Sequence, residues 1–221
     1  MRAEALRLFV MREGLFRQPL YWAARGVVYL VLCVKYRMRV TGREHIPRKG
    51  GAVIAANHAS YLDPPVMAGA IDRRIVHFLA RDTLFSNPAA RWFFPRVGVI
   101  PLDRTRGDLG AMKKTIAALR GGQVVGLFPE GTRSVDGELQ AAKGGVGFLM
   151  AKAGVPVVPM YIEGTHGVFP KGARRLGRGR IVARVGRAIA PEEVAAVVGG
   201  RRGDYEAVGA LVMSRIAALR E

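Results

Sequence analysis

The sequence predicts a single α/β domain in which a mixed, largely parallel sheet is flanked by helices. Short apolar runs that are typical of buried strands alternate with stretches of helical periodicity, and Gly or Pro residues mark the breaks between them. With 221 residues, the chain can form one domain with a substantial core and a helical appendage. We therefore expect an N-terminal helical segment, 1–35, followed by the α/β domain, 36–221.

The N-terminal segment, 1–35, has the composition of amphipathic helices at a bilayer surface. Arginines precede an apolar stretch, 19–34, which is interrupted by Arg25 and is shorter than the ~20 apolar residues that cross a bilayer. Trp22 and several tyrosines are residue types that favour the membrane interface, and no small-residue cleavage site follows them. We predict helices that lie on or dip into one leaflet. Packing against the core of the domain is the alternative.

Strands and helices alternate through the rest of the chain. The apolar runs predict strands at residues 36–41, 51–56, 75–80, 97–102, 124–128, 155–162 and 181–185. Helical periodicity and end signals predict a helix that begins at Asp63 and further helices at residues 108–120, 144–153, 191–198 and 204–219. The prolines of the strand 155–162, Pro156 and Pro159, restrict it to a sheet edge or a bulge.

Charge is the unusual feature of the composition. Lys and Arg number 35 against 17 Asp and Glu, which gives a formal net charge of +18. Such an excess favours an anionic partner, whether nucleic acid, an anionic bilayer, an acidic carrier protein or a phosphorylated substrate. Charge alone does not choose among these partners.

Cysteine and histidine usage excludes several classes of site. The single cysteine, Cys33, rules out an intramolecular disulfide, and its apolar surroundings make it a poor nucleophile. The 4 histidines show no metal-binding spacing, so we expect no metal site.

The segment around His58 and Asp63 carries the first candidate chemistry. On one continuous helix these two side chains would not share a face, but Asp63 before Pro64 is typical of an N-cap followed by a first helical turn. Residues 58–62 would then form a turn after the strand 51–56, and this turn can fold the imidazole onto the carboxylate. Such a pair fixes the histidine tautomer and supports general-base catalysis near neutral pH. The alternatives are an aspartate that only caps the helix and a histidine held by local hydrogen bonds.

Three further segments follow or form buried strands, where α/β folds place ligand-binding loops. The run F-P-E-G-T-R-S at 128–134 combines Gly131, which allows close backbone approach, with Arg133, whose planar guanidinium suits phosphate oxygens. The run G-V-I-P-L-D-R at 98–104 ends in Arg104, and V-P-V-V-P at 155–159 ends in Pro159. Each of these runs, taken alone, is equally consistent with a turn or a surface charge.

Together with N-H-A-S-Y-L-D at 57–63, these runs resemble the motifs of the glycerophospholipid acyltransferase family. The best-known members of that family are bacterial 1-acylglycerol-3-phosphate acyltransferases. The order and approximate separation of the motifs fit the family, and the resemblance covers residues 40–186. It implies transfer of a fatty acyl group from acyl-CoA or acyl-carrier protein to the sn-2 hydroxyl of 1-acylglycerol 3-phosphate, which gives phosphatidic acid.

The resemblance also implies a role for each matching residue. His58 would be the general base and Asp63 would orient it, and the acceptor hydroxyl would attack the thioester directly, without an acyl-enzyme. Arg104 and Arg133 would hold the glycerol phosphate. The other substrate-binding candidates, which would shape the acceptor site or the wall near the acyl chain, are Glu130, Gly131, Thr132, Lys143 and Pro159.

The same resemblance implies the partners. We expect a lysophospholipid acceptor, acyl-CoA or acyl carrier protein as co-substrate, and an anionic membrane surface at the cytoplasmic face of the inner membrane. No cofactor, metal or nucleic acid is expected. The basic stretch 171–180 either docks the acyl donor or anionic lipid or is a solvated loop. Two alternative functions stay open: the same chemistry on another lysolipid or glycolipid, such as a lyso-ornithine lipid, and a non-catalytic basic module that binds membranes or nucleic acid.

Overall fold

The structure is a computed structural model that describes residues 18–102, 109–199 and 204–220. Within these residues the strands form a seven-stranded sheet in the order β1-β7-β6-β2-β5-β3-β4. The strands are β1 (Arg39–Thr41), β2 (Ala52–Ala56), β3 (Val76–Arg81), β4 (Val99–Leu102), β5 (Val124–Leu127), β6 (Val157–Glu163) and β7 (Val182–Val185). Neighbouring strands are parallel except β6 and β7, which are antiparallel. The prediction of a mixed, largely parallel sheet is therefore confirmed.

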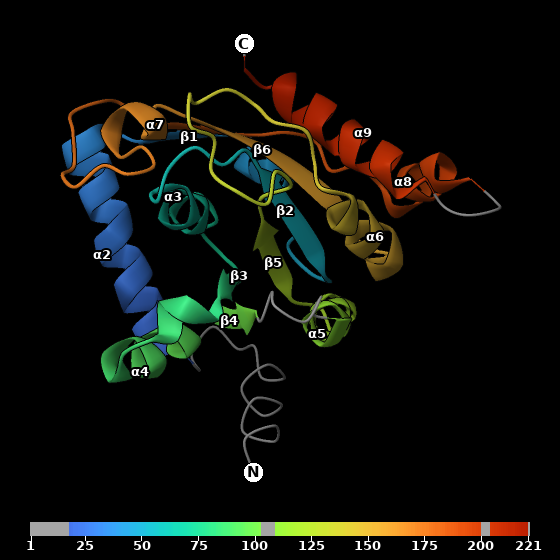
Figure 1. Cartoon of the computed structure of the whole chain (residues 1–221), viewed down its shortest axis with the longest axis horizontal. Coiled ribbons are helices and arrows are strands. Elements are labelled where there is room, and N and C mark those ends of the chain that lie inside the picture. The colour runs from blue at the N-terminus through green and yellow to red at the C-terminus, as the bar shows by residue number, and fades with distance from the viewer. Residues whose placement is uncertain (1–17, 103–108, 200–203, 221) are drawn as a thin grey trace.

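Helices cover both faces of the sheet (Figure 1). They are α2 (Pro19–Tyr36), α3 (Asp63–Ala70), α4 (Pro88–Arg96), α5 (Leu109–Arg120), α6 (Gly144–Ala153), α7 (Thr165–Val168), α8 (Pro191–Val198) and α9 (Tyr205–Ala217), with short 3₁₀ turns η1 (Arg43–His45) and η2 (Asp82–Phe85). Side chains of α2 and α3 form one hydrophobic core with the sheet, and those of α6 and α9 form the other.

The strand β2 is buried along its whole length because helices pack against both of its faces. Its alternate side chains enter the two cores: Ile54 packs on the side of α2 and α3, and Val53 packs on the side of α6 and α9. This explains why the sequence shows an unbroken apolar run here instead of alternation. The strand ends at Ala56, and the segment with His58 begins directly beyond it, at the carboxyl edge of the sheet.

Of the two placements predicted for the proline-bearing strand β6, a sheet edge or a bulge, the edge is excluded, because β6 lies inside the sheet between β7 and β2. Pro159 is tolerated there because it falls just beyond the last pair of the β6–β7 ladder, Met160 with Val185. The pairing is interrupted at the proline and resumes only as an isolated bridge at Val157. The carbonyl of Pro159 still accepts a hydrogen bond from the N–H of Gly186, at 2.8 Å. Because the ladder is interrupted here, residue 159 needs no N–H to pair with β7.

The structure also contains a helix, α4, that the sequence pattern does not predict. Asn87 caps it, since the side-chain oxygen accepts a hydrogen bond from the N–H of Ala90 at 2.8 Å. None of the residues of α4 is buried, and the helix contributes no residue to the two hydrophobic cores. Pro95 inside the helix and the three consecutive aromatic residues before it disfavour a helical assignment from the sequence.

The helix α2 packs one face on the domain and exposes apolar residues on the other. Leu32 and Tyr36 are buried in the core shared with α3. The outward residues are Val27, Leu30, Val31 and Val34, which are 48–74% exposed. Among the described helices, none has both the length and the apolar character that crossing a bilayer requires. Residues 1–17 lie outside the described part of the chain, so the predicted division at residue 35 and the binding of this segment to a membrane stay predictions.

Candidate active site

Three loops meet at the carboxyl edge of the sheet, after the central strands β2, β5 and β6. The side chain of Asn57, directly after β2, donates to the carbonyl of Ile162 at 2.9 Å and accepts from its N–H at 2.7 Å, which ties the first loop to β6. The N–H of Ser134, in the loop after β5, donates to the carbonyl of His58 at 2.7 Å. These hydrogen bonds bring together segments that are far apart in the sequence.

His58 and Asp63 form the pair that the sequence predicts. Nδ1 of His58 lies 2.8 Å from Oδ2 of Asp63. The carboxylate is fully buried, whereas 17% of the histidine side chain is exposed. Because an ionised carboxylate only accepts hydrogen bonds, Nδ1 carries the proton and Nε2 keeps its lone pair. Nε2 has no hydrogen-bond partner within the described residues, so it is free to take a proton from a substrate.

Asp63 does not cap its helix as predicted. It is the first residue of α3, and Leu62 occupies the N-cap position. Oδ2 of Asp63 instead accepts hydrogen bonds from the backbone N–H groups of Ala59 and Ser60, both at 2.7 Å. The carboxylate therefore stabilises the turn that precedes α3, residues 58–62, which we call the catalytic turn.

Thr165 is a site residue that sequence reasoning missed. Its hydroxyl donates to Oδ1 of Asp63 at 2.6 Å, and the threonine is fully buried at the start of α7. It lies 102 residues from Asp63 and outside the four motif segments. The one signal that could have found it is its place directly after the carboxyl end of the central strand β6.

The loop that follows β5 holds His58 in place. The ring of Phe128 stacks on the imidazole, with centroids 4.1 Å apart and planes 19° apart. Oε1 of Glu130 accepts a hydrogen bond from the backbone N–H of His58 at 3.1 Å. The F-P-E-G-T-R-S segment therefore positions the histidine, in addition to any contact that it makes with a substrate.

Glu130, in the loop after β5, is buried and only 2% exposed. Burial raises the pKa of its carboxyl to about 7, and the charge of Asp63 acts in the same direction. Its second oxygen, Oε2, is buried and makes no hydrogen bond of ordinary geometry with the described residues, although the backbone of Gln140 lies close enough to favour the ionised carboxyl. Near neutral pH this carboxyl is therefore present in both its ionised and its protonated form, and the protonated form has a hydroxyl that can donate a hydrogen bond.

Arg133 lies against the catalytic turn. Its guanidinium carbon, Cζ, is 3.4 Å from the centroid of the Tyr61 ring, which is a cation–π contact. Its Nη1 is buried and has no hydrogen-bond partner among the described residues. A guanidinium that is held flat on a ring and keeps an unpaired donor is well suited to bind phosphate oxygens.

Three more predicted residues adjoin this loop. Gly131 has a φ of +64°, a left-handed conformation that favours glycine. A Cβ built on Gly131 would come within 2.8 Å of Cδ of Lys143, so the stem of this exposed lysine lies over the turn. The N–H of Lys143 also donates to the carbonyl of Pro129 at 2.9 Å. Thr132 is half-buried between Gly131 and Arg133.

The last two predicted residues are Arg104 and Pro159. Arg104 lies outside the described residues. Pro159 is buried on β6 between Val157 and Tyr161, whose side chains belong to the core formed with α6 and α9. The helix α3, which begins at Asp63, packs on the other face of the sheet.

The arrangement is suited to acid–base chemistry on a hydroxyl group. His58 presents an unpaired Nε2, Asp63 can stabilise the imidazolium that forms on protonation, and Arg133 supplies a cation beside the same turn. In the described part of the chain, no three His, Cys, Asp or Glu side chains group in a way that could hold a metal ion.

Comparison with known proteins assigns the family. The model of the acyltransferase family matches residues 37–163, more than half of the chain, and this range includes His58, Asp63 and the loop after β5. The chain belongs to the acyltransferase family. The match confirms the resemblance stated from the sequence motifs.

Relatives of this acyltransferase are named 1-acyl-sn-glycerol-3-phosphate acyltransferases. A chloroplastic one from Arabidopsis thaliana is 34% identical over 141 residues, which cover 62% of this chain and 39% of the relative. One from Bacillus subtilis is 28% identical over 161 residues, which cover 71% of this chain and 79% of the relative. The alpha form from Bos taurus is 34% identical over 165 residues, which cover 71% of this chain and 56% of the relative. The chain thus spans 39–40% of the length of the plant relatives that it matches.

A solved structure has the same fold. The 1-acyl-sn-glycerophosphate acyltransferase of Thermotoga maritima superposes with a TM-score of 0.73 over 99% of this chain and 81% of its own. The two sequences are 24% identical. The likeness therefore supports the fold of the acyltransferase domain.

Thr165→Val should lower the rate of acyl transfer by about tenfold, because it leaves an oxygen of a buried carboxylate without its donor. The effect should fall on kcat with little change in either KM, and Thr165→Ser should restore most of the rate. Thr115→Val, which removes a buried hydroxyl bonded to the carbonyl of Ala111 on α5, is the matched control. Release of free thiol from an acyl thioester measures the rates, and a Ser variant as slow as the Val variant would count against a role in holding Asp63.

Glu130→Gln should change how stability depends on pH. In the unfolded chain the carboxyl ionises near its ordinary pKa of 4.5, whereas in the fold its pKa is about 7. The folded state therefore binds more protons between these values, and the free energy of unfolding falls as pH rises through this range, by at most about 3 kcal/mol. The glutamine keeps an acceptor for the N–H of His58 but removes this fall.

Urea unfolding of both proteins at about pH 5 and about pH 8 measures the effect. The parent protein should lose stability relative to Glu130→Gln at the higher pH. A difference between the two proteins that is the same at both pH values would contradict the raised pKa.

Proposed function

We propose that this chain transfers a fatty acyl group from acyl-CoA or acyl-carrier protein to the sn-2 hydroxyl of 1-acylglycerol 3-phosphate and so forms phosphatidic acid. The observation that carries the proposal is the stacking of Arg133 on Tyr61, because Tyr61 belongs to the same turn that presents His58. A glycerol phosphate carries an anionic group and a reactive hydroxyl, and this turn presents the base, His58, while its Tyr61 holds the cation of Arg133. The names of the relatives agree with this acceptor.

The proposed reaction is a direct transfer. Nε2 of His58 takes the proton of the acceptor hydroxyl as the oxygen attacks the thioester carbonyl, and Asp63 stabilises the imidazolium. The tetrahedral intermediate then collapses, the carbon–sulfur bond breaks, and the imidazolium returns the proton to the departing thiolate. Atoms and charges balance with the two substrates alone, so we propose that no cofactor or metal takes part.

We propose that the protein works at an anionic membrane surface. Val27, Leu30, Val31 and Val34 form an exposed apolar strip on α2, and such a strip can enter the interfacial region of a bilayer. The formal charge of +18 would add attraction to anionic lipids. The proposed location is the cytoplasmic face of the inner membrane, because both acyl donors are made inside the cell. We propose no nucleic-acid partner.

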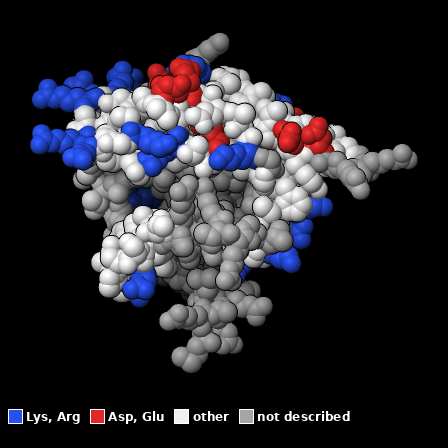
Figure 2. Space-filling model, in the orientation of Figure 1, with Lys and Arg blue, Asp and Glu red and all other residues white. Residues whose placement is uncertain are grey.

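The basic loop after α7 adjoins the catalytic turn. Ser60, in the catalytic turn, forms a β-bridge with Pro170, and its hydroxyl donates to the carbonyl of Phe169 at 2.7 Å. Lys and Arg side chains gather over α7 and the adjoining loop in Figure 2. The exposed cations of this loop are Lys171, Arg174, Arg175, Arg178 and Arg180. We propose that they contact the phosphates of coenzyme A or the acidic surface of a carrier protein.

His58→Ala should lower turnover by ~100- to 10,000-fold, because it removes the general base. The purified protein, in detergent or vesicles, is supplied with acyl-CoA or acyl-carrier protein and with lysophosphatidic acid or a panel of other lysolipids, and free thiol is measured. His45→Ala, a histidine bonded to the carbonyl of Val185, is the control.

Turnover with lysophosphatidic acid that is lost in His58→Ala but kept in His45→Ala is the expected result. Turnover only with another lysolipid would retain the chemistry and replace the acceptor. Absence of thiol release with every pair, or full activity in His58→Ala, would reject the proposed reaction.

Arg133→Ala should raise the KM for lysophosphatidic acid by about 10- to 100-fold, because it removes the charged partner of the phosphate. The KM for the acyl donor should change little. Arg215→Ala, which removes an exposed arginine paired with Glu193, is the matched control. Steady-state kinetics with each substrate varied in turn measure both constants, and an unchanged acceptor KM in Arg133→Ala would remove this residue from phosphate binding.

A further inference from the structure

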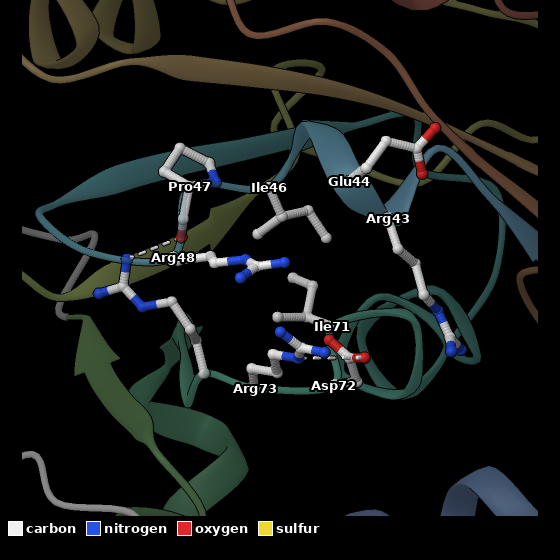
Figure 3. Close-up of a pocket in the computed structure, with 9 residues that line it drawn as sticks. Arg43, Glu44, Ile46, Pro47, Arg48, Ile71, Asp72 and Arg73 are labelled. Atoms are coloured by element: carbon white, nitrogen blue, oxygen red, sulfur yellow. Dashed lines mark hydrogen bonds and ion pairs between the residues drawn. The ribbon is translucent and has the colours of Figure 1, made fainter.

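A second charged site lies at the other end of the sheet from His58. A pocket of about 220 Å³ opens between the loop that follows β1 and the loop that links α3 to β3 (Figure 3). The first loop leads into β2 and the second into β3, so the pocket lies at the amino ends of these two parallel strands. His58 follows the carboxyl end of β2, and the pocket is therefore separate from the active site.

The lining of the pocket is rich in arginine. It contains four arginines against two carboxylates, and these charged residues are Arg43, Arg48, Arg73, Arg74, Glu44 and Asp72. Arg48 and Arg73 reach toward the middle of the pocket, whereas Glu44 points away from it (Figure 3). The ion pair between Arg73 and Asp72 is 3.9 Å long, and both side chains are about half exposed or more. Such a pair neutralises little charge.

Arg74 makes one wall of the pocket rigid. Its Nη1 donates to the carbonyls of Pro47 at 3.2 Å and Gly50 at 2.6 Å, and its Nη2 donates to the carbonyl of Gly122 at 2.5 Å. These bonds fix the loop that carries Arg48 against the loop that carries Arg74 itself. The backbone positions of Arg48 and Arg74 are therefore held close together by the fold.

Arg43 is left with an unsatisfied donor at the edge of this pocket. Its Nη2 donates to the hydroxyl of Tyr29 at 3.0 Å, but its Nε is buried without a hydrogen-bond partner among the described residues. The guanidinium carbons of Arg25 and Arg43 both lie near the Tyr29 ring, at 5.7 and 5.4 Å from its centroid. Burial lowers the pKa of Arg25, and the charge of Arg43 lowers it further. An anion in the pocket would offset part of this repulsion between the two guanidinium groups.

The size of the pocket and its donors suit a phosphate group. Guanidinium forks bind phosphate oxygens in pairs, and the volume accommodates a phosphate with a few attached atoms. Tyr29, which supports Arg43, belongs to α2, whose outward face is the apolar strip of Val27, Leu30, Val31 and Val34. We propose that this pocket binds the phosphate of an anionic phospholipid headgroup, with Arg48 and Arg73 as its direct contacts, while the outer face of α2 meets the lipid surface.

Binding measurements test the site independently of turnover. Every protein carries Arg133→Ala, so that phosphate does not bind at the acyl-acceptor position. The pocket variant is Arg48→Ala with Arg73→Ala, and the matched control, Lys113→Ala with Lys114→Ala, removes two exposed charges from α5. Inorganic phosphate is titrated by calorimetry, and flotation measures binding to phosphatidylcholine vesicles with and without phosphatidylglycerol.

We expect the pocket variant to bind phosphate about tenfold more weakly and to lose most of its added binding to phosphatidylglycerol vesicles, while the control variant keeps both. Loss of phosphate binding with unchanged vesicle binding would overturn the lipid as the source of the phosphate and assign the pocket to a soluble ligand. Equal losses of phosphate binding in the pocket variant and the control variant, or no loss in the pocket variant, would show that the pocket does not bind phosphate. Failure of the proposed reaction would leave each of these readouts intact.

Discussion

The carboxylate of Asp63 is fully buried, and each of its hydrogen-bond donors has to be in place for such a charge to be tolerated. Two backbone N–H groups and the imidazole of His58 come from the catalytic turn, and the hydroxyl of Thr165 comes from the far end of β6. The turn after β2 and the turn after β6 therefore depend on one another. If either turn shifted, the buried carboxylate would lose one of its hydrogen-bond donors. The fold therefore fixes the orientation of His58.

The parallel arrangement of the central strands makes this dependence possible. β5, β2 and β6 are neighbours, and their carboxyl ends lie at one edge of the sheet. Asn57 connects the loop after β2 to β6, and Ser134 connects the loop after β5 to His58. Glu130 also accepts a hydrogen bond from the backbone N–H of His58. A change in the protonation of Glu130 therefore alters the electrostatics of the turn that presents the base. Stability and chemistry at this edge are therefore governed by the same hydrogen bonds.

Local sequence patterns were sufficient to predict the part of the site that is local. The sheet strands follow from apolar runs, and the pair of His58 and Asp63 follows from a turn between a strand and a proline-marked helix. The hydrogen bond from Thr165 and the stacking of Arg133 on Tyr61 depend on loops that are distant in sequence, so no local pattern predicts them. The helix α4 escaped prediction because it is short and has a proline, Pro95, inside it. The prolines of β6 allowed an edge or a bulge, and the edge is excluded because β6 lies inside the sheet with a ladder that breaks at Pro159.

The charge of +18 favours an anionic partner but does not say where it binds, and the structure distributes that charge among unlike environments. Arg25 donates to carbonyls at the end of α3, so its charge is partly buried and holds the helix to α2. Arg133 stacks on a ring beside the base, whereas the loop around Arg175 is exposed to solvent. Salt screens exposed cations far more than buried ones. Added salt should therefore weaken contacts of the exposed loop first, while the arginines held on rings or carbonyls keep more of their attraction for a bound anion.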